Sequence, residues 1–180
     1  MKRRTFALYP AAAFCWGLGR HAQAQNYPSR PITLVVPQPP GGAIDSIARG
    51  LGEELGKRMG VPFVVDDRPG ASGMIGTSAV AHANPDGYTL LVTNHTPVLA
   101  APFVFSKVPY DVRKDLTLIT AIAGGQFVLA VNSEVVPART MAEFVEWARR
   151  TRGTASYGSL GIGTYSHLAG AFLVQSRGLD

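Results

Sequence analysis

The stretch that most constrains the fold of this chain runs from residue 32 to residue 59. Residues 32–36 are an apolar, largely β-branched run, residues 37–42 are rich in proline and glycine, and apolar residues recur at helical spacing over residues 43–59. This pattern predicts a strand, a tight loop and an amphipathic helix. The buried face of the helix is expected to consist of Ile44, Ile47, Ala48, Leu51, Leu55 and Met59.

The loop before this helix is a candidate anion site. Gly41 and Gly42 come directly before the helix start, where the first N–H groups have no acceptor within the helix and favour negative charge. An ordinary connection that binds nothing is the alternative. The loop lacks both the Walker A pattern and G-x-G-x-x-G, so no nucleotide is expected. Asp45 would repel an anion unless it contacts another part of the ligand, and we expect it to pair with Arg49 on the exposed surface of the helix.

Residues 1–24 have the pattern of a secretory signal peptide. Basic residues at positions 2–4 precede an apolar segment, and Ala22-Gln23-Ala24 fits the small-x-small cleavage rule. Arg3 and Arg4 leave the twin-arginine route open beside the general export route. No later stretch of the sequence is long and apolar enough to predict a membrane span.

The predicted signal also explains most of the basic charge. The formal net charge of +5 falls to +1 when the four basic residues of residues 1–24 are removed. We therefore expect no nucleic-acid partner. The single cysteine, Cys15, lies in the same segment, so neither a disulfide nor a cysteine-based metal site is expected in the remaining chain.

After the opening unit, patterns typical of strands and helices alternate. We predict strands over residues 63–65 and 88–93, with a helix over residues 74–83 between them. Such alternation favours an α/β fold with a parallel sheet and right-handed crossovers. Ligands bind at the carboxyl ends of the strands in such sheets. The segments expected to share that rim are residues 39–45, 68–73 and 94–96.

The later part of the chain is expected to enter a second lobe. Residues 101–114 are predicted to be an irregular surface connection, and Gly124 and Gly125 separate two apolar runs where the chain would cross between lobes. We therefore predict a first lobe over residues 25–123 and a second over residues 124–180. The elements expected in the second lobe are a helix that begins at the Thr140-Met141-Ala142-Glu143 capping box, a short strand over 155–157 and a helix over 165–176.

A second glycine-rich loop, residues 158–164, precedes the last predicted helix. Hydroxyl groups at Ser159, Thr164 and Ser166 accompany its glycines. The opening pattern of strand, loop and helix start thus recurs, and two such helix starts facing each other could hold the two ends of a small diacid.

Catalytic and metal chemistry find little support in the sequence. A secreted serine hydrolase would need Ser72 or Ser159 with His95 or His167, and no G-x-S-x-G motif is present. No paired carboxylates or histidine cluster suggests a metal site. We expect no cofactor and no enzymatic activity, and keep the hydrolase as the alternative.

Five motifs in order carry a family resemblance. They are residues 27–32 (YPSRPI), 36–45 (VPQPPGGAID), 68–73 (RPGASG), 85–90 (PDGYTL) and 161–170 (GIGTYSHLAG). Together they resemble the extracytoplasmic receptors of tripartite tricarboxylate transporters, the Bug family. The resemblance covers essentially all of the chain after residue 24.

The resemblance implies a two-lobed fold of the type II periplasmic binding protein class. It further implies a receptor in the periplasm that hands a small carboxylate, such as a di- or tricarboxylate, to membrane permease subunits. The ligand-binding residues that it implies are Gly41, Gly42 and Asp45 in one lobe, Ser159, Gly161, Gly163, Thr164 and Ser166 in the other, and Ser72, Asn94 and His95 at the rim.

Two departures from the family pattern are present. Ala171 stands where the family usually carries glutamate, which removes one expected helix contact. Relatives also continue well beyond the position of Asp180, so the resemblance predicts an incomplete second lobe with an exposed sheet edge and a poor core. A remnant without binding activity is therefore a further alternative.

Overall fold

The computed structural model describes residues 26–151 and 153–179. The predicted signal peptide and Cys15 lie outside the described residues. No helix among the described residues is both long enough and apolar enough to cross a membrane.

A parallel sheet of three strands forms the centre of the first lobe. Its order is β2 (Phe63–Asp67), β1 (Ile32–Val36) and β3 (Thr89–Leu91), with Ile32 opposite Phe63 and Thr33 opposite Thr89. The predicted parallel α/β arrangement is confirmed. β3 is shorter than the predicted strand over 88–93 because β1 ends at Val36 and is followed by Pro37, which has no N–H to continue the ladder.

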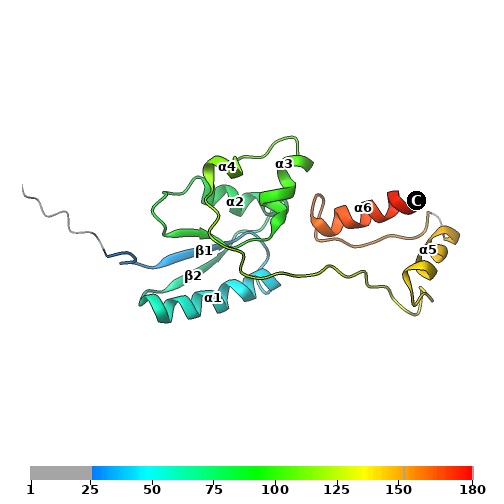
Figure 1. Ribbon diagram of the computed structural model, residues 1–180, viewed down its shortest axis with the longest axis horizontal. Coiled ribbons are helices and arrows are strands. Elements are labelled where there is room, and N and C mark those ends of the chain that lie inside the picture. The colour runs from blue at the N-terminus through cyan, green and yellow to red at the C-terminus, as the bar shows by residue number, and fades with distance from the viewer. Residues whose placement is uncertain (1–25, 152, 180) are drawn as a thin grey trace, which may run out of the picture.

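Helices cover the two faces of this sheet. α1 (Ala43–Met59) has the predicted bounds; it follows Gly42 and ends at Gly60, which has a φ of 71°. Its predicted buried face is wrong in part, because the buried residues of α1 are Asp45, Ala48 and Gly52, and Met59 is 38% exposed. α2 (Met74–Ala81) lies on the other face (Figure 1). A Cβ at Gly52 of α1 would come within 3.3 Å of Leu34, so this glycine lets the helix approach the sheet closely.

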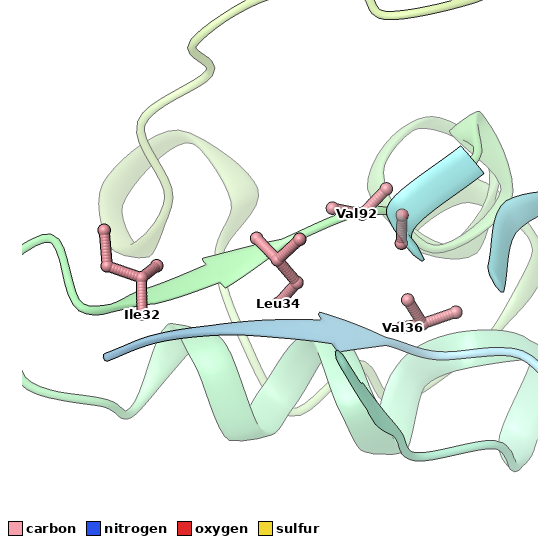
Figure 2. Packing of buried hydrophobic residues seen from close by; sticks show 5 residues of the cluster. Ile32, Leu34, Val36 and Val92 are labelled. Atoms are coloured by element: carbon pink, nitrogen blue, oxygen red, sulfur yellow. The ribbon is translucent and has the colours of Figure 1, made fainter. Parts of the chain in front are cut away.

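The main core lies between β1 and α1. Ile32, Leu34 and Val36 project from the same side of β1, with Val92 close by (Figure 2). Ala48 of α1 completes the buried cluster. Val35, whose side chain points to the opposite side of β1, is also buried, as a strand with helices on both faces requires.

The predicted irregular surface connection over residues 101–114 is wrong in part: most of these residues are exposed, but with residues 96–100 they form short helical turns, and two of them are buried against α2. The segment forms a π-helical turn (Thr96–Ala100) and the short helices α3 (Ala101–Val104) and α4 (Val112–Asp115). Ala101 and Tyr110 are buried against Met74, and the Tyr110 hydroxyl donates to the Pro97 carbonyl at 2.7 Å. Burial of these apolar side chains overrides the local proline signals.

The rest of the chain leaves the first lobe and returns to it. Residues 117–135 are exposed throughout; residues 117–132 run without regular secondary structure and residues 133–135 form a turn. They lead to α5 (Met141–Arg150), which packs with α6 (Tyr165–Arg177) away from the sheet (Figure 1). The predicted capping box is present: Thr140 Oγ1 accepts from the Glu143 N–H at 3.2 Å. The core of this helix pair is a small cluster of Val145, Ala148 and Leu179 with Phe144, Trp147 and Val174 around it.

The predicted strand over residues 155–157 is wrong. These residues have no sheet partner in the part of the chain that the structure describes. A strand is stable only when a neighbour takes up its backbone hydrogen bonds, and apolar pattern alone does not supply one.

Candidate functional site

The loop between β1 and α1 is held by a side chain of the helix that follows it. Gly41 is exposed and has a φ of 79°. Its N–H donates to Asp45 Oδ2 at 2.7 Å. Gly42 is the N-cap residue of α1 and makes no side-chain cap, so in the described chain the Gly41 N–H is the only donor of residues 39–42 that bonds to a side chain.

Asp45 is buried, with 3% of its surface exposed, so the prediction of an exposed pair with Arg49 is wrong in that respect. The ion pair itself forms, with Arg49 Nε 2.7 Å from Asp45 Oδ1. Another nitrogen of the same guanidinium lies 3.0 Å from Asp67 Oδ2 at the end of β2. The hydrogen bond from Arg49 and then that from Gly41 lower the pKa of Asp45, which is therefore a carboxylate at neutral pH.

The loop between β2 and α2 contains an unusual run of left-handed backbone. Gly70, Ala71, Ser72 and Gly73 all have positive φ, at 127°, 47°, 54° and 91°. Alanine and serine rarely adopt this conformation, which costs about 1–3 kcal/mol at each such residue and persists where the surroundings impose it. The result is that Ser72 Oγ donates to the Ile162 carbonyl at 2.7 Å, which joins the first lobe to the second glycine-rich loop.

At the end of β3, His95 contacts the start of α6. The rings of His95 and Tyr165 meet edge to face with centroids 3.8 Å apart, and the ring of Phe127 stacks on that of Tyr165 at 6.3 Å. Asn94 faces its own loop, because its Oδ1 accepts from the Thr96 N–H at 3.0 Å. His95 therefore lies at the junction of the two lobes, while the side-chain oxygen of Asn94 is used locally.

The second glycine-rich loop closes on itself through its hydroxyl groups. Thr164 is the N-cap of α6, and its Oγ1 donates to the Gly161 carbonyl at 2.6 Å. Ser166 Oγ accepts from the Leu160 N–H at 3.1 Å, and Ser159 Oγ lies 3.4 Å from the Gly161 nitrogen.

Gly163 packs directly on the first lobe. A Cβ at this position would come within 2.7 Å of the Phe105 ring, and its φ is 77°. Both the closeness of the ring and the positive φ favour glycine at position 163. The contact between the loop and Phe105 therefore depends on Gly163.

The structure brings some of the predicted residues together and leaves others apart. Ser72, His95 and the loop around Gly161 and Gly163 meet at one junction. No hydrogen bond among the described residues joins Gly41 or Gly42 to this junction. Both α1 and α6 nevertheless begin on the side where the two parts of the chain face each other (Figure 1).

Four residues of the junction lie outside the predicted ligand-binding set, among them Phe105, which packs on Gly163, and Phe127, which stacks on Tyr165. Ile162 contributes its backbone carbonyl and Tyr165 its ring. A carbonyl contact has no sequence signal. Tyr165, by contrast, directly follows the glycine-rich loop, and an aromatic residue at the first position of a helix that faces a rim is a signal that could have found it.

The hydrolase alternative gains no support from this geometry. The Ser72 hydroxyl donates to a carbonyl group, and Ser159 lies against a backbone amide. The Nδ1 atom of His167 lies 3.3 Å from the Gly163 nitrogen, so it faces the backbone. No group of three or more His, Cys, Asp or Glu side chains among the described residues could hold a metal ion.

Sequence comparison matches residues 47–180 to the family TctC, described as the tripartite tricarboxylate transporter family receptor. A UPF0065 protein from the tcbD-tcbE intergenic region of Pseudomonas sp. (strain P51) is 41% identical, over 89% of this chain and 47% of that protein. Protein BugT of Bordetella pertussis is 33% identical, over 84% of this chain and 47% of its own length. The chain spans about half the length of the curated relatives it matches.

Solved structures share the fold. The R. palustris protein Rpa4515, solved with adipate, superposes with a TM-score of 0.80 at 31% identity, over 86% of this chain and 51% of that chain. MatC from Rhodopseudomonas palustris, solved with bound malate, gives a TM-score of 0.68 at 26% identity, over 86% of this chain and 52% of that chain. The described chain thus has the α/β fold of periplasmic binding proteins, with one lobe and part of the second.

Proposed function

Since this chain belongs to the tripartite tricarboxylate transporter receptor family, we propose that it is a solute-binding receptor that captures a small carboxylate for a membrane permease. The two similar proteins solved with a ligand hold adipate and malate. Both are dicarboxylates, which is the class of ligand that two opposed donor sites would suit.

The observation that carries the proposal is the junction between Ser72 and Ile162. This hydrogen bond keeps the start of α6 beside the carboxyl ends of the strands, where ligands of parallel sheets bind. The start of α1 lies at the same rim, so backbone N–H groups from two helix starts are available to one anion with two charged ends.

Apart from Asp45, the proposed ligand contacts are those that the family resemblance implies. Gly41 and Gly42 belong to the first-lobe side, and Ser159, Gly161, Gly163, Thr164 and Ser166 to the other. The hydroxyls of Thr164 and Ser166 are now bonded within their own loop, so a ligand carboxylate would take the place of those partners. Ser72, Asn94 and His95 complete the rim of the proposed site. The proposal assigns residues 25–123 to the first lobe and residues 124–180 to the second.

Location and partners follow from the same family. Residues 1–24 act as an export signal in this proposal, and the receptor works in the periplasm without catalysing a reaction. Its macromolecular partner is the permease of a tripartite tricarboxylate transporter. Closure of the lobes is driven by contacts that the ligand makes only in the closed state.

A thermal-shift panel tests the proposal. We would compare acetate, malate, adipate and citrate with adipamide, a neutral analogue of adipate. At 100 times Kd a ligand stabilises the folded state by about 2.7 kcal/mol, which raises Tm by roughly 5–10 °C for a chain of this size. A rise with one carboxylate class and none with adipamide is expected, while no rise with any carboxylate would refute the receptor function. Ester hydrolysis that disappears in Ser159→Ala or Ser72→Ala would favour the hydrolase instead.

A further inference from the structure

The carboxylate of Asp45 is buried and contacts two groups of its own chain. One oxygen accepts the Gly41 N–H at 2.7 Å, and Arg49 Nε lies 2.7 Å from the other. The Asp45 side chain is 5% exposed, against 54% for its partner Arg49. Oδ1 is ion-paired with Arg49 but has no hydrogen-bond partner among the described residues, and because the side chain is buried, this oxygen has no open space for direct contact with a ligand.

Asp45 instead controls the loop in front of α1. In the described chain it provides the only side-chain hydrogen bond to residues 39–42, and it acts on Gly41, whose φ of 79° turns the chain into the helix. Gly42 and Ala43 follow, both exposed. Their N–H groups belong to the helix start, which has no intrahelical acceptor for them.

The same arrangement weakens an electrostatic objection to anion binding. A bare carboxylate in the first turn would repel a carboxylate ligand, but the Arg49 guanidinium neutralises it at 2.7 Å. Asp67 lies 3.0 Å from a second nitrogen of Arg49 and holds that side chain toward the sheet. Asp45 and Asp67 share one guanidinium, so the three side chains keep one negative charge between them, and the Asp45 carboxylate nearest the helix start is buried and ion-paired.

We propose that Asp45 is a positioning residue for carboxylate binding, which fastens Gly41 so that the N–H groups of Gly42 and Ala43 face the ligand. This inference rests on the proposed receptor function. It changes the role of Asp45 from a ligand contact to a support of the loop.

Isothermal titration of the whole chain with malate and with aspartate separates the two roles. The variants are Asp45→Ala, which removes the acceptor for Gly41, and Asp45→Asn, whose amide oxygen can still accept that N–H without the charge. Glu53→Gln is the matched control, since Glu53 pairs with Lys57 at 2.8 Å on the same helix and away from the loop.

A positioning role predicts that Asp45→Ala weakens the binding of malate and of aspartate by the same factor. The expected rise in Kd is about tenfold or more, because a hydrogen bond to a charged group contributes about 1.5–3 kcal/mol. Asp45→Asn is expected to restore most of the affinity, and Glu53→Gln to leave it unchanged. A direct contact with the ligand's ammonium group would instead make both Asp45 variants lose aspartate selectively. That result, or equal losses in Asp45→Ala and Asp45→Asn, would overturn the inference.

Amide hydrogen exchange at Gly41 gives a second readout that needs no ligand. Exchange should be slow in the unmodified chain and in Asp45→Asn and faster in Asp45→Ala, and equal rates in all three would overturn the inference even if Asp45→Ala folds poorly. If the unmodified chain binds neither malate nor aspartate nor any carboxylate of the thermal-shift panel, the receptor function fails and this inference fails with it. If the unmodified chain binds and Asp45→Ala binds equally well, only this inference fails.

Discussion

The hydroxyl of Ser72 donates a hydrogen bond of 2.7 Å to the carbonyl oxygen of Ile162, 90 residues further along the chain. Ser72 reaches this carbonyl from a backbone conformation with a φ of 54°, within a run of four residues of positive φ. The contact joins two loops that the sequence places in different lobes. It is one of the few hydrogen bonds that position the start of α6 relative to the sheet.

Removing this hydroxyl should loosen the second glycine-rich loop. Ser72→Ala loses a hydrogen bond that contributes about 0.5–1.5 kcal/mol, and water can reach the freed carbonyl because the contact is exposed. We expect faster hydrogen exchange over residues 158–168 with little change in α1. Ser78→Ala is the control, since Ser78 bonds only within α2. Equal exchange in both variants would show that the contact does not hold the loop.

Gly163 should be intolerant of a side chain. In Gly163→Ala the new methyl group would lie 2.7 Å from the Phe105 ring, and the positive φ adds about 1–2 kcal/mol. We expect the free energy of unfolding, measured by urea titration, to fall by at least that amount. Gly125→Ala is the control, because no atom lies within 4 Å of its Cβ position. A Gly163→Ala variant as stable as this control would contradict the packing described.

Part of the stability should depend on pH through Asp45. Its pKa is lowered in the folded chain by Arg49 and then Gly41, so the ionised form is favoured by folding. The stabilisation is present above the unfolded pKa of about 3.9 and is lost as pH falls through the lower folded value. Between pH 7 and pH 3 the unmodified chain should lose more stability in urea titrations than Asp45→Asn does. An identical loss in both would show that Asp45 gains nothing from its partners.

The extended segment over residues 117–132 should cause self-association. Every residue of this segment is exposed, including Ile119 at 76% and Val128 at 86%. Unpaired extended backbone with apolar side chains is prone to pair with another chain. We expect the mass measured by light scattering to rise with protein concentration, and Val128→Lys to reduce the rise. Thr120→Lys, which adds the same charge at a polar site, is the control. If it reduces the rise in mass as much as Val128→Lys does, the added charge alone is the cause.

Local sequence patterns determined the elements whose stability is set by neighbours along the chain. β1 and α1 occur at the predicted residues, because a β-branched run, two loop glycines and a helical apolar period act within one short segment. The Thr140 cap of α5 and the start of α6 at Tyr165 are equally local. The candidate loops could be found in the same way, because each has glycines directly before a predicted helix.

Tertiary structure decided which groups in those loops remain free. The burial of Asp45 against Gly41 and Arg49, the reach of Ser72 to Ile162 and the contact of His95 with Tyr165 all depend on how separate elements pack. The same holds for Ala101 and Tyr110, which packing buries against α2, and for residues 155–157, which lack the partner a strand needs. Periodicity records which face of an element is apolar, but a hydrogen bond between distant residues exists only after the chain has brought its donor and acceptor together.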